Sequence, residues 1–160
     1  MSNLVSTEWL AAHLNDVRVV DASWYMPNDK RNPHAEFEAA HIPGAVHFDI
    51  DAIADRSTDL PHMMPSAEAF AEAVGALGIG NGDTVVVYDG SGIFSAPRVW
   101  WMFKAMGHDQ VKVLDGGFPI WRREMHPIET GAVRPESQIF RANLRPAIMR
   151  DFDDVMNTVK

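Results

Sequence analysis

The sequence contains no cysteine among its 160 residues. Disulfide frameworks, thiolate zinc sites, redox pairs and every enzyme with a cysteine nucleophile are therefore excluded for this chain by itself. No apolar run approaches the roughly 18 residues that a membrane helix needs. The first residues also lack the basic region and apolar core of a secretory signal peptide. We therefore expect a cytoplasmic protein that is not inserted in a membrane.

Positive charge is also scarce, with 14 Lys and Arg against 22 Asp and Glu and a formal net charge of −8. This balance argues against a general nucleic-acid binder and against a polybasic module for membrane surfaces. A small anionic substrate would need a locally positive site. The remaining composition, 46% hydrophobic and 22% charged, is that of an ordinary globular protein, and the length predicts one main domain.

Short apolar strands alternate with amphipathic helices along most of the chain. This alternation predicts an α/β fold, with a mainly parallel sheet of about five strands and helices on both faces. The segment 85–88 is apolar at every position and is expected at the centre of the sheet. Strands are predicted at 17–22, 46–50, 83–88 and 111–114, and helices after Ser6 and at 35–40, 67–77, 97–106 and from 117 onward.

The loop that follows Tyr88 is the first candidate for chemistry, because parallel α/β sheets bind ligands beyond the carboxyl ends of their strands. Its glycines do not complete a dinucleotide fingerprint, since Ser95 stands where the third glycine is required, and no phosphate-binding lysine follows. We therefore expect no nucleotide cofactor. Asp89 has two interpretations, a phosphatase nucleophile or a carboxylate that caps the next helix. The cap is favoured, because no second aspartate lies two residues further on.

The histidines do not form a recognisable metal site. His41 and His47 lie on either side of a Pro-Gly turn, at a spacing that does not match two ligands on one helix, so structural or surface roles are expected and no metal is predicted. Asp51 and His62 lie in polar loops, where a carboxylate can orient an imidazole. From spacing alone, solvated loop residues remain the default interpretation of this pair.

Four segments carry a family resemblance. The stretch 37–48 reads Phe-Glu-Ala-Ala-His-Ile-Pro-Gly-Ala-Val-His-Phe, and it is accompanied by Asp-Ala-Ser-Trp-Tyr at 21–25, Phe-Ser-Ala-Pro-Arg-Val-Trp-Trp-Met-Phe at 94–103 and Leu-Asp-Gly-Gly-Phe-Pro at 114–119. From about Val5 to its end, the chain resembles the N-terminal domain of the two-domain rhodanese sulfurtransferases that use 3-mercaptopyruvate or thiosulfate.

The resemblance implies two rhodanese domains in tandem, of which only the second carries a nucleophilic cysteine. Asp89 occupies the corresponding loop position here, so residues 1–135 are expected to be a catalytically silent rhodanese-like domain. Its carboxylate would lie where the sulfur anion lies in an active loop and would repel an anionic donor. Residues 136–160 are expected to be the interdomain linker and the start of a truncated second domain, packing poorly from residue 140.

The resemblance also implies a function for the whole protein and a role for this half. Sulfane sulfur would pass from 3-mercaptopyruvate or thiosulfate through a cysteine persulfide to cyanide or a thiol, without a cofactor. Trp24, Asp51 and His62 would line the interdomain cleft, where Asp51 either orients His62 or merely braces the cleft. The expected partner is the second domain, or another copy at the uncovered face. The alternative is a stand-alone inactive rhodanese module with a docking or regulatory role.

Overall fold

The structure is a computed structural model that describes residues 4–23, 32–48, 67–90, 95–131 and 136–142. Strands and helices alternate through these ranges, as the sequence predicts. None of the helices in the described ranges is long and apolar enough to cross a membrane. The elements are β1 (Leu4–Val5), α1 (Thr7–His13), β2 (Arg18–Asp21), α2 (Pro33–Ala39), β3 (Val46–His47), α4 (Ala67–Ala76), β4 (Val85–Tyr88), α5 (Ala96–Ala105), β5 (Val111–Leu114) and α6 (Gly117–Arg123).

The strands form one five-stranded sheet in the order β1-β5-β4-β2-β3, and every pair of neighbours is parallel. All four residues of β4 are buried, so the prediction that this segment is the central strand is confirmed. The strand β1 was not predicted, because two residues are too few to show a pattern. The strand predicted at 46–50 is described as Val46–His47, and residues 49–50 lie outside the described ranges.

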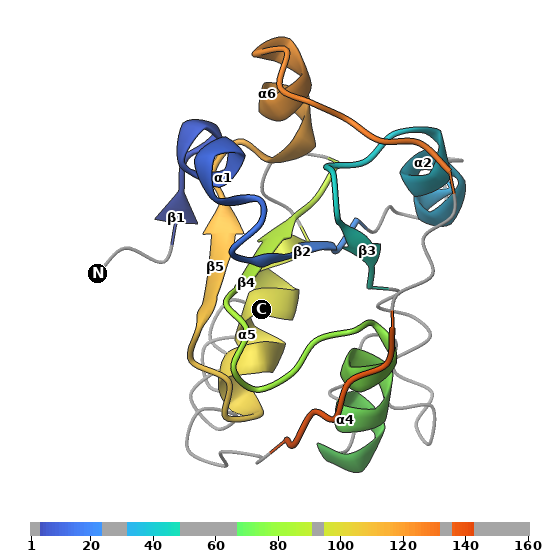
Figure 1. Cartoon of the computed structure of the whole chain (residues 1–160), viewed down its shortest axis with the longest axis vertical. Coiled ribbons are helices and arrows are strands. Elements are labelled where there is room, and N and C mark those ends of the chain that lie inside the picture. Colours follow the sequence, from blue (N-terminus) through green and yellow to red (C-terminus); the bar gives the residue numbers. More distant parts are fainter. Residues whose placement is uncertain (1–3, 24–31, 49–66, 91–94, 132–135, 143–160) are drawn as a thin grey trace, which may run out of the picture.

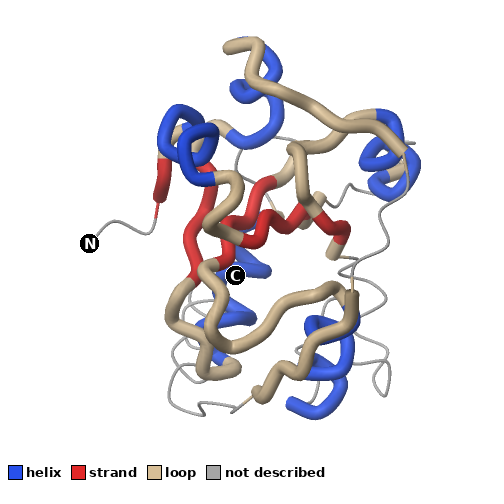
Figure 2. The backbone as a smooth tube through the Cα atoms, viewed as in Figure 1, coloured by secondary structure: helices blue, strands red, loops and turns tan. Residues whose placement is uncertain are grey.

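The strand order places a topological switch between β2 and β4. The chain leaves β2 toward β3 on one side of the sheet and leaves β4 toward β5 on the other side. Figure 2 shows these strands as the red centre of the molecule. In open parallel sheets, a crevice opens beyond the carboxyl ends of the strands at such a switch. The ends of β2 and β4 are therefore the natural place for a site.

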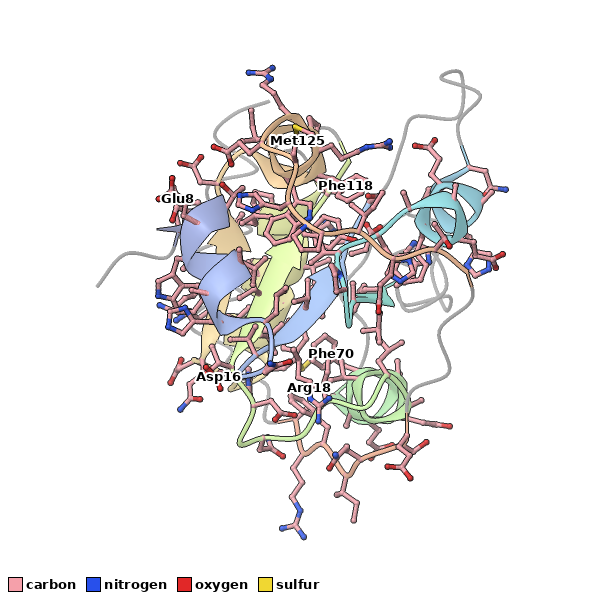
Figure 3. All side chains as sticks on the ribbon, turned by 45° about the horizontal axis from the view of Figure 1, so that its top comes forward. Glu8, Asp16, Arg18, Phe70, Phe118 and Met125 are labelled. Carbon is pink, nitrogen blue, oxygen red and sulfur yellow. The ribbon has the colours of Figure 1, made fainter. Side chains whose placement is uncertain are left out.

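Helices cover both faces of the sheet, as predicted. In Figure 1, α1, α2 and α6 lie above the sheet, and α4 and α5 lie below it. The upper layer buries Leu10, Phe37 and Trp121 against the sheet. The lower layer buries an aromatic group, and Figure 3 shows one of its members, Phe70, above α4. This larger lower cluster contains Phe48, Phe70, Phe103, Phe140 and the apolar side chains of α5.

The segment 136–142 packs along α4 (Figure 1). The backbone N–H of Gln138 donates to the carbonyl of Gly75 at 2.8 Å, and a Cβ at Gly75 would lie 2.5 Å from the Gln138 carbonyl oxygen. Phe140 is only 5% exposed and belongs to the lower aromatic cluster. The expectation of poor packing from residue 140 is therefore wrong at Phe140, because its ring packs against Phe70 and Phe103 in the lower cluster. Residues 143–160 lie outside the described ranges, and the domain boundary at 135 stays a prediction.

Candidate functional site

The candidate site lies beyond the carboxyl ends of β2 and β4. Asp21 ends β2, and Ser23 lies two residues further along the chain. Tyr88 ends β4, and Asp89 begins the loop that leads to α5. Asp21, Ser23 and Asp89 are all buried, at 4%, 6% and 1% exposure. Because buried polar groups are costly without partners, their hydrogen bonds define what the site can do.

Asp89 caps the first turn of α5. Its Oδ2 accepts hydrogen bonds from the backbone N–H groups of Ser95 at 2.9 Å and Ala96 at 2.8 Å. Ser95 holds the usual capping position but gives α5 no side-chain cap. The negative carboxylate also suits the positive end of the helix dipole. The interpretation of Asp89 as a helix cap is confirmed.

Two further hydrogen bonds fasten the loop to the end of β2. The N–H of Gly90 donates to the hydroxyl oxygen of Ser23 at 2.9 Å. The hydroxyl of Ser95 donates to the carbonyl of Ala22 at 2.6 Å. The first and last described residues around the loop, Gly90 and Ser95, are thus both held by residues 22 and 23. Residues 91–94 lie outside the described ranges.

The carboxyl of Asp21 is the most perturbed acid of the site. Burial raises its pKa from 3.8 to about 6, against hydrogen bonds from Ser23 and Tyr88 that favour the ionised form, and the charge of Asp89 raises it further. Ser23 donates its backbone N–H to Oδ1 of Asp21 at 2.8 Å. The Tyr88 hydroxyl, in turn, accepts the N–H of Ile42 at 3.3 Å. Burial thus holds the pKa of Asp21 at about 6, inside a network of hydrogen bonds.

A hollow of about 260 Å³ opens next to this network. Its floor comes from the ends of β2 and β4, and its walls come from α2 and α6. The guanidinium of Arg122, on α6, lies 5.6 Å from the Phe118 ring centroid. Figure 3 shows Phe118 below α6, on the side toward α2. The polar and aromatic lining consists of Asp21, Ser23, Glu36, Tyr88, Phe118 and Arg122.

The sequence-predicted cleft residues Trp24, Asp51 and His62 lie outside the described ranges, so their grouping stays a prediction. His41 has a structural role, since it is 1% exposed and its Nδ1 lies 2.8 Å from the carbonyl oxygen of Phe37. In the part of the chain that the structure describes, no three His, Asp or Glu side chains are placed to hold a metal ion.

Sequence reasoning missed two members of the hollow, Glu36 and Arg122. Each lies on a helix far along the chain from the strand ends, and neither belongs to a motif. The only signal was general, namely that ligands bind at the carboxyl edge of a parallel sheet.

Comparisons with known proteins agree with this fold. The sequence model of the family described as "Rhodanese-like domain" matches residues 6–124. The chain is 57% identical over 131 residues to the mitochondrial thiosulfate/3-mercaptopyruvate sulfurtransferase 1 of Arabidopsis thaliana, covering 81% of this chain and 35% of that protein. It is 46% identical over 165 residues to the human 3-mercaptopyruvate sulfurtransferase, covering 98% of this chain and 56% of that protein.

The chain also resembles a crystal structure of SseA from Escherichia coli, a 3-mercaptopyruvate sulfurtransferase, with a TM-score of 0.86 and 40% identity over 91% of this chain and 57% of that one. The chain thus spans 35% to 57% of the length of these three proteins. The matched family segment covers most of the chain and includes β2, β3, β4 and β5. The chain belongs to the rhodanese-like domain family, and its relatives are 3-mercaptopyruvate and thiosulfate sulfurtransferases.

Proposed function

We propose that this chain is the N-terminal, non-catalytic rhodanese domain of a sulfurtransferase whose catalytic cysteine lies in a second domain. The observation that carries the proposal is the capping carboxylate of Asp89 in a chain without cysteine. Support also comes from relatives that are named sulfurtransferases and of which this chain spans about half or less.

The chemistry requires a thiolate. A cysteine thiolate attacks the sulfur of 3-mercaptopyruvate or thiosulfate, forming an S–S bond, while pyruvate enolate or sulfite leaves with the electron pair. Cyanide or a thiol then attacks the outer sulfur of this persulfide, and the enzyme thiolate is released. With cyanide, the product is thiocyanate. No side chain in this sequence supplies the thiolate.

The loop after β4 is also badly placed to act through oxygen. The carboxylate of Asp89 is 1% exposed and accepts two backbone hydrogen bonds, so an attack on sulfur would break the cap of α5. A carboxylate is in any case a far weaker nucleophile toward sulfur than a thiolate. The loop therefore supports a structural role for this domain.

In the proposed protein, this domain forms one wall of an interdomain cleft. Trp24, Asp51 and His62 are the proposed wall residues, with Asp51 orienting His62 near the donor or bracing the cleft. The second rhodanese domain is the proposed partner. In a chain that lacks it, the same wall would favour pairing with a second copy.

The test compares thiocyanate production by the 160-residue chain and by the full product of its gene. Both are given 3-mercaptopyruvate or thiosulfate together with cyanide. We expect turnover only from a longer product that contains a cysteine loop, and His62→Ala in that product should lower turnover without unfolding it. Turnover by the purified 160-residue chain would contradict the proposal. A gene that encodes no further domain would instead support a stand-alone docking or regulatory module.

A further inference from the structure

The hollow between α2 and α6 lies where this fold favours a ligand. Its floor is built from Asp21 and Ser23 at the end of β2 and from Tyr88 and Gly90 at the end of β4. These two strands flank the topological switch of the sheet, where ligands of parallel α/β folds bind. Asp89 does not line the hollow, because its carboxylate turns toward the first turn of α5. The hollow therefore borders this loop at Gly90 without containing the Asp89 carboxylate.

We propose that this hollow binds a small zwitterion, an α-amino acid, with its ammonium toward the two acidic side chains and its carboxylate toward Arg122. The inference goes beyond the proposed function, because it requires neither the second domain nor a cysteine. It rests on the cavity, on the signs of the charges that line it, and on its size.

The charges of the hollow have both signs. Asp21 lies at the floor of the hollow and is 4% exposed. Glu36, a half-buried residue of α2, also lines the hollow. Arg122 lies at the rim, on the exposed side of α6. A simple anion, including a sulfur donor such as thiosulfate, would meet two carboxylates, and a simple amine would leave the guanidinium without a ligand partner. A ligand that carries both charges a few bonds apart satisfies the whole set.

The walls and the size restrict the rest of the ligand. Phe118, Pro119 and Ala39 give the hollow an apolar wall. The Arg122 guanidinium lies 5.6 Å from the Phe118 ring centroid, an arrangement that holds the cation near the mouth. The volume of about 260 Å³ is far above the 10–15 Å³ or so that one water needs and just below the range of pockets for drug-sized ligands. A small amino acid fits this interval.

Binding should depend on pH through Asp21. The groups that act on this carboxyl are Ser23 from its own segment and Tyr88 and Asp89 from β4 and the following loop. Glu36 from α2 and Arg122 from α6 face the same hollow. A bound ammonium favours the ionised carboxylate, whereas the protonated acid offers it less attraction. Affinity should therefore rise between pH 5 and pH 7.

The experiment titrates the 160-residue chain with L-serine and follows backbone amide shifts by NMR. We expect saturable shifts at the ends of β2 and β4, and weaker binding of ethylamine or acetate at the same concentrations. Arg122→Gln should weaken L-serine binding about tenfold or more, as expected for the loss of a charged hydrogen bond. Arg123→Gln is the matched control, because Arg123 is the exposed neighbour that does not line the hollow, and it should leave binding unchanged.

Glu36→Gln should weaken L-serine and ethylamine alike, and Asp21→Asn should remove the rise in affinity between pH 5 and pH 7. Circular dichroism shows whether each variant folds, and the exposed Arg122 provides a test if a buried substitution does not. The proposal is overturned if L-serine gives no saturable shifts. It is also overturned if acetate or ethylamine binds as tightly, or if the Arg122 and Arg123 variants behave alike. Since no turnover is measured, these outcomes are independent of the thiocyanate test.

Discussion

Two regions of this domain are held by different forces: the lower aromatic cluster, and the hydrogen-bond network at the carboxyl ends of β2 and β4. Below the sheet, aromatic rings pack edge to face, with centroids 5.2 Å apart for Phe70 and Phe103 and 5.8 Å apart for Phe70 and Phe140. At the carboxyl ends of β2 and β4, buried carboxylates and hydroxyls hold the chain through hydrogen bonds. Apolar packing stabilises in proportion to the area buried at any pH, whereas a polar network depends on every partner and on protonation. The lower aromatic cluster should therefore account for most of the stability, and the network at the strand ends should add a pH dependence through Asp21.

The largest expected effect is at Phe140. Phe140→Ala should lower the free energy of unfolding by about 3–5 kcal/mol, the usual cost of removing a buried aromatic ring. Urea denaturation of the 160-residue chain measures the loss. The matched control is Ile139→Ala, because Ile139 is 81% exposed and its truncation should change stability by no more than about 0.5 kcal/mol. Equal effects at the two positions would show that residues 136–142 are not part of the core.

The next effect is a pH dependence of the free energy of unfolding, which is expected from the network at the strand ends. Because the pKa of Asp21 is raised from 3.8 to about 6, the folded state binds more protons than the unfolded state between these values. The cost of ionising Asp21 is therefore absent below pH 3.8 and fully present above pH 6, where it amounts to about 3 kcal/mol. Asp21→Asn should remove this decline, so the stability difference between variant and parent should shift by about that amount between pH 4 and pH 7.

Urea denaturation at several pH values measures the difference for Asp21→Asn. Val74→Ala is the control, because Val74 is fully buried in the lower cluster and its loss should be nearly constant over the same pH interval. If the plots of unfolding free energy against pH run parallel for Asp21→Asn and the parent, the buried carboxyl does not titrate as its surroundings imply. The contrast between the two regions then fails.

The smallest of the three effects concerns the cap of α5. Asp89→Ala leaves the N–H groups of Ser95 and Ala96 without their acceptor, so stability should fall by about 2 kcal/mol. Asp89→Asn keeps one carbonyl oxygen and should lose less. Asp16→Ala, at an exposed residue outside any helix (Figure 3), serves as the control for removing one negative charge. A loss at Asp16 as large as at Asp89 would argue against the cap.

The fold could be predicted largely because its signals are local. The β-branched segment 85–88 between glycine-containing turns identifies the central strand, and Ser6 marks the start of α1, where its hydroxyl oxygen accepts the N–H of Trp9 at 3.0 Å. The burial of Phe140 had no such signal. It follows a segment without periodicity, and its contacts with Phe70 and Phe103 join residues far apart in the sequence.

The site shows the same difference between local signals, which the sequence reveals, and contacts between distant residues, which it does not. The cap by Asp89 spans only a few residues and was predicted, whereas the bond from Gly90 to Ser23 joins residues 67 positions apart. Glu36 and Arg122 meet the strand ends only through the packing of two helices, which no spacing in the sequence encodes. The grouping of Trp24, Asp51 and His62 came from the family resemblance and stays a prediction.

The docking of Phe140 has a consequence for the order of events at the ribosome. The lower core takes a ring from a segment that follows every strand and helix of the described domain. Domains fold as units while the chain is synthesised from its N-terminus. This one cannot close its core when α6 emerges from the exit tunnel, and it must wait until residue 140 has emerged. During that interval the faces of Phe70 and Phe103 that Phe140 covers stay open to solvent and to chaperones. A pause in translation just after α6 should therefore lengthen an aggregation-prone stage of its synthesis.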